Sequence, residues 1–462
     1  MSILYYLKKY MKMSRRQRKN ELKSTLWFMP FWYIVGSICL SFFTYYLDYV
    51  IDISLYLPVG FGFSGTTLQV LLSALVGGVL TLSAFTINSL LVALTTFSGQ
   101  FSSKMLVNFV SDRATQHVVG IFNGCFIYVL LNFLYVTHGE EEYIVATPIL
   151  SILTAILAAI TFIYFINHTT TWMQVHNISY NLNIKSKSIH SSLEKELQPF
   201  HSQAQVDDQK LPNKPGKTIY AKQSGYLQVA DFAKLIKKAQ EDHLLLQFEV
   251  RIGEFVLDGS PIFSYWSSQE SVNPDRYLKS LEIGLKQTEI QDLEYGLSKL
   301  SEVAIKALGH NDPLTVTNTL HQITDLIKNI VTKSDFSPYL FDQEGELRLI
   351  LMQKDFRYYL HKGFAYIREF SNQNSAIITE ILSMVHLLSK TIDERYHEEL
   401  WEFSNQTILG FKNCQLYEND CYYMLEQLYK IALETNRNKE YSSLQSYLQD
   451  RICADMPVPN PS

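Results

Sequence analysis

Apolar residues are concentrated in the first 170 positions of the chain, and the later positions have the mixed polar and apolar pattern of a soluble protein. Stretches of at least 20 residues without a charged side chain lie at 26–47, 68–97, 117–136 and 146–172. A helix of roughly 20 residues is long enough to cross the apolar core of a bilayer. The pattern therefore predicts four transmembrane helices in a domain over residues 25–172.

The second stretch organises this domain, because it is the longest and carries many small and polar residues. Neither Lys nor Arg occurs between Ser24 and Ser103. Steps of three and four residues keep side chains on one face of a helix, and here such steps connect a polar stripe. The stripe consists of Gly78, Thr81, Phe85, Asn88, Val92, Thr95 and Gly99.

Two interpretations of the stripe are open. An amide inside a membrane is costly against lipid, so Asn88 is expected to face protein or water. Hydroxyl and amide groups repeated around a symmetric oligomer would line a permeation path. Small residues with Asn, Ser or Thr would also suit close packing and hydrogen bonding between helices. The polar residues over 95–104 and the lack of charge within the membrane favour the permeation path.

The charges of the loops predict the orientation of the chain. Residues 1–24 carry eight basic residues against one acid, and the loop over 98–116 carries two basic residues. The loops over 48–65 and 137–143 carry acids and no Lys or Arg. Basic loops stay on the cytoplasmic side. We therefore expect a multi-pass membrane protein with both its N-terminus and its C-terminus in the cytoplasm.

The C-terminal two thirds are expected to be a cytoplasmic α+β region, which makes the fold class a membrane α-helical protein with four transmembrane helices and this region. Residues 173–217 read as a linker that starts as a short helical continuation of the fourth span, and residues 218–268 as a small β-rich subdomain. Residues 269–455 read as a helical domain and 456–462 as a disordered tail. Helices are predicted over 276–308, 314–332 and 347–372, among others.

The composition gives little support to catalysis. The net charge of −5 provides no electrostatic basis for nucleic-acid binding. None of the five cysteines forms a C-x-x-C pair, which disfavours a disulfide framework and a zinc site, and the three C-terminal cysteines fit a reducing compartment. The motif Tyr396-His397-Glu398-Glu399 lacks the second His of a zinc protease helix, and no phosphate-binding Gly-rich loop occurs. We expect no enzymatic activity, no metal and no cofactor.

A candidate polar site of the cytoplasmic domain is formed by Gln291, Asp292, Asn311 and Asp312. Its residues lie roughly twenty positions apart and would have to meet on one surface to bind a ligand. The simpler alternative concerns Asp312, which precedes a Pro at the start of an apolar periodic segment. That arrangement is typical of a helix cap.

Four short stretches carry a resemblance to a known family. Residues 92–104 (VALTTFSGQFSSK) are similar to its pattern VALxxxSSQFSPR, and residues 108–113 (NFVSDR) to xFxxDR. Residues 287–292 (QTEIQD) resemble RTxxQD, with Gln287 at the usual Arg, and residues 311–315 (NDPLT) resemble NDPxT. The chain thus resembles, over about residues 25–400, bacterial predicted membrane proteins labelled domain of unknown function 2254. The resemblance implies a protein of the bacterial inner membrane with this architecture, and it brings no established activity.

These patterns together predict a homo-oligomeric channel or channel-like transport protein. Its second span would line the axis, its partners would be the lipid bilayer and an ion or small ligand, and its cytoplasmic domain would act as gate or sensor. The alternative is a membrane-anchored cytoplasmic interaction or signalling scaffold without permeation activity.

Overall fold

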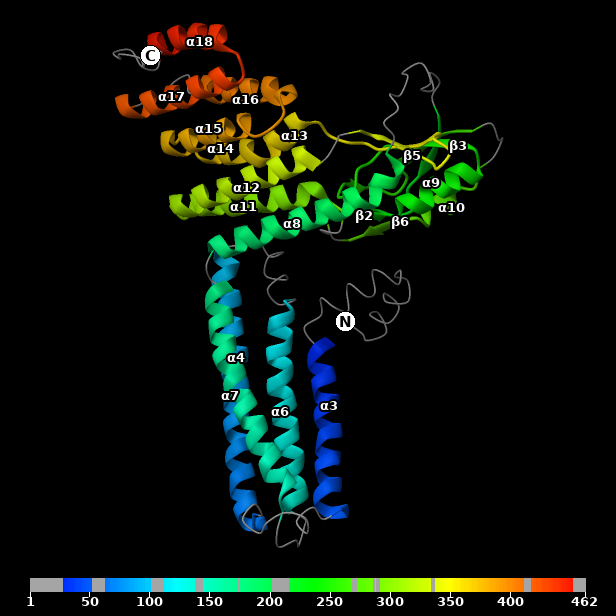
Figure 1. Cartoon of the computed structure of the whole chain (residues 1–462), viewed down its shortest axis with the longest axis vertical. Coiled ribbons are helices and arrows are strands. Elements are labelled where there is room, and N and C mark those ends of the chain that lie inside the picture. Colours follow the sequence, from blue (N-terminus) through cyan, green and yellow to red (C-terminus); the bar gives the residue numbers. More distant parts are fainter. Residues whose placement is uncertain are drawn as a thin grey trace. The chain divides into compact units, whose positions relative to one another are not determined.

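The computed structural model describes residues 28–51, 63–100, 112–137, 144–172, 175–201, 216–267, 272–285, 287, 291–333, 337–410 and 417–451. The chain divides into two compact units, Met1–Gln174 and Val175–Ser462, which we call the N-terminal unit and the C-terminal unit. Figure 1 shows the helices and strands of both units. The basic segment 1–24 and the tail 456–462 lie outside the described residues.

The N-terminal unit is built from long apolar helices. These are α3 (Phe28–Tyr45), which continues as a π-helical turn (Tyr46–Val50), α4 (Gly65–Gln100), α6 (Arg113–Thr137) and α7 (Ala146–Trp172). Within the described residues, four helices are long and apolar enough to cross a membrane. The prediction of four candidate spans is confirmed at this level.

The buried centre of the N-terminal unit is α6, which contacts α3, α4 and α7. Half of its apolar stretch is buried, against 22 % for α4 and 22 % for α7. A Cβ at Gly120 would overlap the Tyr33 ring, and one at Gly124 would lie 2.8 Å from the Ser37 hydroxyl. These two glycines therefore let α3 approach α6 closely. The sequence had given the organising role to the second span, whereas the structure centres the unit on the third.

The N-terminus of α7 is held by a carboxylate from the turn after α3. Asp48 is buried and accepts hydrogen bonds from the backbone N–H of Ala146 (2.8 Å) and Thr147 (2.8 Å) and from the Thr147 hydroxyl (2.6 Å). The first N–H groups of a helix have no partner within the helix, so an acceptor at this point stabilises it. Asp48 thus fixes the end of α3 to the start of α7.

Residues 175–197 belong to the compact C-terminal unit, although the sequence predicted a linker over 173–217. They form α8 (Val175–Leu197), which packs against α11 (Leu293–Gly309) and α12 (Pro313–Lys333). The Asn183 amide on α8 donates to Gln322 (2.8 Å) and Asp325 (2.7 Å) on α12. Apolar positions such as Leu182 and Leu193 recur on the buried face of α8.

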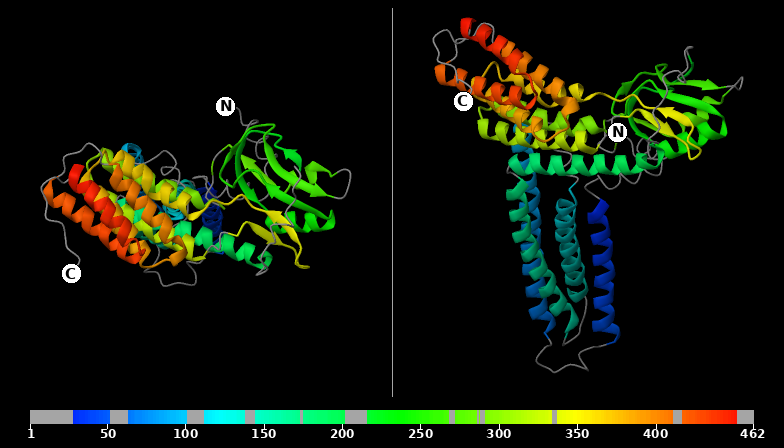
Figure 2. Two further views of the ribbon diagram at one scale, coloured as in Figure 1. Left: turned by 90° about the horizontal axis from the view of Figure 1, so that it is seen from above. Right: turned by 45° about the horizontal axis from the view of Figure 1, so that its top comes forward.

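More helices complete one end of the C-terminal unit, away from the strands (Figure 2). They are α13 (Phe356–Leu360), α14 (Tyr366–Phe370), α15 (Ser375–Ser389), α16 (His397–Leu409), α17 (Glu418–Glu434) and α18 (Asn438–Arg451). A π-helical turn (His361–Ala365) joins α13 to α14, and a Cβ at Gly363 in this turn would lie 2.8 Å from Ile323 and Ile327 of α12. Cys421 in α17 is disulfide-bonded, which corrects the expectation of a reduced thiol at this position, and Cys414 and Cys453 lie outside the described residues.

Two sheets form the other end of the C-terminal unit. The five-stranded sheet has the order β1-β5-β3-β8-β7, and the three-stranded sheet has the order β4-β2-β6. The first is formed by β1 (Lys217–Tyr220), β3 (Leu244–Phe248), β5 (Pro261–Ser267), β7 (Tyr339–Phe341) and β8 (Leu347–Ile350), and the second by β2 (Gly225–Ala230), β4 (Phe255–Val256) and β6 (Leu281–Gly284). The β3–β8 pair is parallel, and the other pairs are antiparallel. The amphipathic α9 (Phe232–Glu241) packs against β3 and β8.

The helices predicted over 276–308 and 347–372 are wrong in their first parts. A short α10 (Pro274–Leu278) is followed by strand β6, and strand β8 lies where the second of these helices was expected to begin. Apolar runs this short do not distinguish helix from strand, and pairing with β2 and β3 decides the outcome. The sheets therefore include strands from the range expected to be a helical domain.

Candidate functional site

The polar stripe of α4 lies on the outward face of the N-terminal unit. Each of its members with a described side chain is exposed, whereas Leu72, Val79, Leu90 and Ala93 on the opposite face are buried. The exposed members are Gly78, Thr81, Phe85, Asn88, Val92 and Thr95. Gly99 belongs to α4, but its surroundings lie outside the described residues. The helical spacing thus places the predicted stripe on one continuous face.

Several groups on this face of α4 have no neighbour within the single chain. A Cβ built at Gly77 or Gly78 would meet no atom within 4 Å. The Asn88 side chain makes no hydrogen bond with any residue that the structure describes. The Thr81 hydroxyl, in contrast, donates to the Gly77 carbonyl at 2.8 Å. The face therefore offers an unpaired amide and open space beside two adjacent glycines.

The candidate polar site of the C-terminal unit is not assembled as one site. Gln291 and Asp292 precede α11, whereas Asn311 and Asp312 follow it. The helix between them has 17 residues, which at 1.5 Å per residue separate its ends by roughly 25 Å. Asp312 instead caps α12, since its carboxylate accepts from the N–H (3.1 Å) and hydroxyl (2.6 Å) of Thr315.

Gln291 and Asp292 are both buried and tie α11 to the strands. The Gln291 side chain accepts from the Ala230 N–H (2.9 Å) and donates to the Ala230 carbonyl (3.1 Å), as a neighbouring strand would. The Asp292 carboxylate caps α11 by accepting from the N–H of Glu294 (2.9 Å) and Tyr295 (3.2 Å). The side-chain amide of Gln287 donates to the other carboxylate oxygen at 2.8 Å.

The buried position of Asp292 shifts the pKa of its carboxyl group upward. Burial raises its pKa to about 6, although the hydrogen bonds from Gln287 and from the N–H groups of Glu294 and Tyr295 act in the opposite direction. A Cβ at Gly253 would overlap the Asp292 carboxylate, and Gly253 has a φ of +89°. A glycine is therefore required at this turn for both its space and its backbone conformation.

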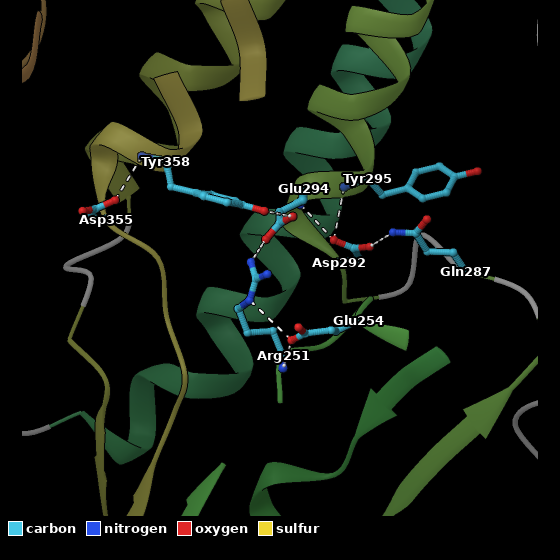
Figure 3. A network of polar contacts seen from close by, with 8 residues as sticks. All are labelled: Arg251, Glu254, Gln287, Asp292, Glu294, Tyr295, Asp355 and Tyr358. Atoms are coloured by element: carbon cyan, nitrogen blue, oxygen red, sulfur yellow. Dashed lines mark hydrogen bonds and ion pairs between the residues drawn. The ribbon is translucent and has the colours of Figure 1, made fainter. Parts of the chain in front are cut away.

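A polar network extends from this carboxylate to α13, as Figure 3 shows. Glu294 accepts from the Arg251 guanidinium and from the Tyr358 hydroxyl (2.7 Å). The Arg251 guanidinium also lies over the Tyr358 ring, 5.1 Å from its centre. The backbone N–H of Arg251 donates to the Glu254 carboxylate at 3.0 Å. Sequence reasoning missed this network because Arg251 lies 43 positions and Tyr358 lies 64 positions from Glu294 along the chain.

A pocket of about 110 Å³ adjoins Arg251, Asp292 and Glu294, with apolar walls that include Phe232 and Phe248. A wider hollow of about 490 Å³ shares Phe248 with it and follows the ends of the parallel strands β3 and β8. The ends of parallel strands are common ligand positions. Within the described residues, no group of three or more His, Cys, Asp or Glu side chains is arranged to hold a metal ion. This corner combines a buried carboxylate, a guanidinium and a small pocket with mainly apolar walls.

Comparison with known proteins places the chain in a family. Its sequence is 26 % identical over 311 residues to uncharacterized proteins of Mycobacterium bovis and Mycobacterium tuberculosis, a match that covers 63 % of this chain and 58 % of theirs. The chain thus spans little more than half the length of these relatives. No solved structure matches it. The family of predicted membrane proteins labelled DUF2254 matches residues 23–386, which confirms the resemblance, and the chain belongs to that family.

Proposed function

We propose that this chain is a multi-pass membrane protein that assembles from identical copies into a channel-like transport protein. The outward faces of α4 would surround the axis, and the C-terminal unit would lie in the cytoplasm as gate or sensor. The observation that carries the proposal is the exposed stripe of α4, on which Asn88 has no hydrogen-bond partner among the described residues.

Lipid is a poor neighbour for this stripe. An amide that faces acyl chains leaves its donors and acceptor unsatisfied, at a cost of several kcal/mol per group. A glycine within a helix costs about 1 kcal/mol relative to Ala, and two adjacent exposed glycines permit the close approach of another helix. Gly120 and Gly124 have such a contact within the chain, with α3, whereas Gly77 and Gly78 have none. A second copy of α4 would supply it.

A ring of copies would turn this face into the wall of a path. Thr81, Asn88 and Thr95 would contribute hydroxyl and amide groups at successive depths, with no charged side chain among them. Such a wall suits a partly hydrated ion or a small polar solute. The distribution of basic residues in the loops supports a cytoplasmic position for both termini. The family of predicted membrane proteins supports a place in the inner membrane.

The proposal is tested by cross-linking and flux measurements on the full chain in liposomes. On a Cys39→Ser background, chosen because Cys39 is an exposed free thiol, Thr81→Cys should form disulfide-linked pairs of copies. The matched variant Ile160→Cys, on the exposed face of α7, should not form them. The wild-type assembly should release a trapped small ion from liposomes.

The outcomes distinguish the channel from the alternative, a membrane-anchored interaction or signalling scaffold without permeation. Absence of cross-links at Thr81 would reject the assembly, and with it the channel. Cross-linked assemblies that hold the ion as tightly as protein-free liposomes would reject the channel and leave the scaffold function. Reporter fusions that place the C-terminus outside the cell would reject the orientation.

A further inference from the structure

Three segments of the C-terminal unit meet at the carboxylate of Asp292. The first is the turn after β3, where Gly253 lies so close that a Cβ would overlap this carboxylate. The second is the segment before α11, from which Gln287 donates its amide. The third is the start of α11, whose first N–H groups, of Glu294 and Tyr295, donate to the carboxylate. One side chain thus joins the strand region to the helical region.

We propose that Asp292 and these contacts form a proton-controlled latch between the turn over 251–254 and the start of α11. The latch is closed when Asp292 holds a proton and opens more often when Asp292 is ionised. This inference concerns the C-terminal unit alone and does not depend on the proposed channel.

The charges around Asp292 leave its own charge uncompensated. The charged and titratable groups that surround it are Glu294 on α11, Arg251 and Glu254 in the turn, Glu194 and Glu196 on α8, and Lys354, Tyr358 and Tyr359 at or just before α13. The Arg251 guanidinium is engaged by Glu294 and Glu254. Asp292 has no ion pair with any described residue. Its three hydrogen bonds all come from neutral donors.

Proton binding and latch opening are therefore linked. In the closed latch, burial raises the pKa of Asp292 to about 6. When the latch opens, water from the adjoining pocket hydrates the carboxylate and its pKa falls towards the ordinary value of about 4. The closed state thus binds the proton more tightly, so a rise in pH favours the open state. Between pH 5 and pH 7 this difference shifts the equilibrium by about tenfold.

A second buried aspartate of the same unit supplies a matched control. Asp342 lies between β7 and β8 and accepts from the Arg348 guanidinium (2.6 Å) and from the N–H groups of Glu344 and Glu346 (3.0 Å each). Burial favours its neutral form, but Arg348 and the two N–H groups outweigh burial and hold the pKa of Asp342 below its ordinary value. Asp342 therefore stays ionised from pH 5 to pH 7.

Hydrogen exchange of the full chain in detergent, corrected for the intrinsic pH dependence of exchange, tests the latch. The amides of Glu294 and Tyr295 report on it directly, because both donate to Asp292. In the wild type, the opening equilibrium measured from the exchange of these two amides should increase about tenfold from pH 5 to pH 7. Asp292→Asn keeps an oxygen that can accept from these two amides but has no titrating proton. Opening of the latch in this variant should therefore be rare and independent of pH.

Two more variants complete the experiment. Gln287→Arg places a cation beside the carboxylate, so the closed latch accepts the charge and the pH dependence between 5 and 7 should vanish. Asp342→Asn should keep the wild-type dependence at both amides. The latch is rejected by a wild type whose corrected opening does not change with pH. It is also rejected when Gln287→Arg, or a folded Asp292→Asn, retains the wild-type response.

Discussion

Helices α4 and α7 have equally small buried fractions in the single chain, 22 % of each apolar stretch, but their exposed faces differ in composition. The outward face of α7 is covered by large branched side chains, among them Ile152, Leu153, Ile156, Ile160 and Ile163. The exposed part of α4 mixes large apolar residues such as Leu80 and Leu91 with small and polar residues, among them Ser73, Ala74, Gly77, Gly78, Thr81 and Asn88. The proposed function assigns different neighbours to these two faces.

In the proposed assembly, the chemistry of each face would select its neighbour. Branched aliphatic side chains match acyl chains in polarity and fill the space between them. Association of helices within lipid depends instead on close packing and interhelical hydrogen bonds, because lipid removes the hydrophobic driving force. Small residues permit the close packing, and an amide such as that of Asn88 needs polar partners that lipid does not offer. The face of α7 therefore suits lipid, and the face of α4 suits another copy of α4 and the water that the copies enclose.

The largest effect is expected on the free energy of unfolding, at Gly120, which already packs against α3. Gly120→Leu would force a side chain into the Tyr33 ring and disturb the hydrogen bond between Tyr33 and His117 (2.9 Å). We expect the free energy of unfolding to fall by about 2–3 kcal/mol. Thermal unfolding in detergent measures it. A variant as stable as the wild type would show that α3 and α6 do not pack closely at this position.

The next largest effect is expected at the glycines without a neighbour. The double variant Gly77→Leu/Gly78→Leu should fold, because both positions face open space in the single chain, but it should lose assembly because the added side chains hold the copies apart. Light scattering of the detergent-solubilised protein measures the mass of the assembly.

Gly36 on α3 provides the control for this variant. It is exposed and also has no atom within 4 Å of a built Cβ, but it shares its face with aromatic residues such as Trp32 and Phe43. Gly36→Leu should leave the assembly unchanged. Equal loss of assembly in both variants, or in neither, would remove the distinction between the α4 face and a lipid-facing surface.

A smaller effect is expected at the amide. Asn88→Leu replaces a polar group of the proposed path by an apolar one of similar size. We expect the assembly to persist and the ion flux per assembly to fall by about tenfold, which corresponds to about 1.4 kcal/mol in the barrier. Flux from liposomes at matched protein content measures it. An unchanged flux would remove Asn88 from the path and leave it a helix-packing residue.

Signals that lie close together in the sequence were sufficient for several features. The lack of charge predicted the four apolar helices, and Asp312 followed by Pro313 predicted the cap of α12. The three- and four-residue steps also placed Thr81 and Asn88 on one face of α4. Each of these features depends on residues within a few helical turns, so the chain needs no distant partner to reveal it.

Features that depend on distant partners were not predictable. The central position of α6 depends on Gly120 meeting Tyr33. Strand β8 exists because it pairs with β3, about 100 residues earlier, and nothing in its four residues excludes a helix. Arg251 and Tyr358 became parts of one network only when the fold brought both to Glu294. Gln291 and Asp292 were identified as candidates, but their contacts with Ala230 and Gly253 were not.

The smallest effect is expected on the outward face of α7, and it tests the comparison from the lipid side. Ile160 is 60 % exposed, and truncation of a side chain in contact with lipid removes no burial from water. Ile160→Ala should therefore change the free energy of unfolding by less than about 0.5 kcal/mol and leave the mass of the assembly unchanged. The matched truncation Val92→Ala, on the α4 stripe, removes packing between copies and should weaken assembly by about 1 kcal/mol. Dilution series in detergent, followed by light scattering, measure both variants. A larger loss of assembly in Ile160→Ala than in Val92→Ala would reverse the assignment. The α7 face would then be the one that meets another copy, and the α4 face would be the one that meets lipid.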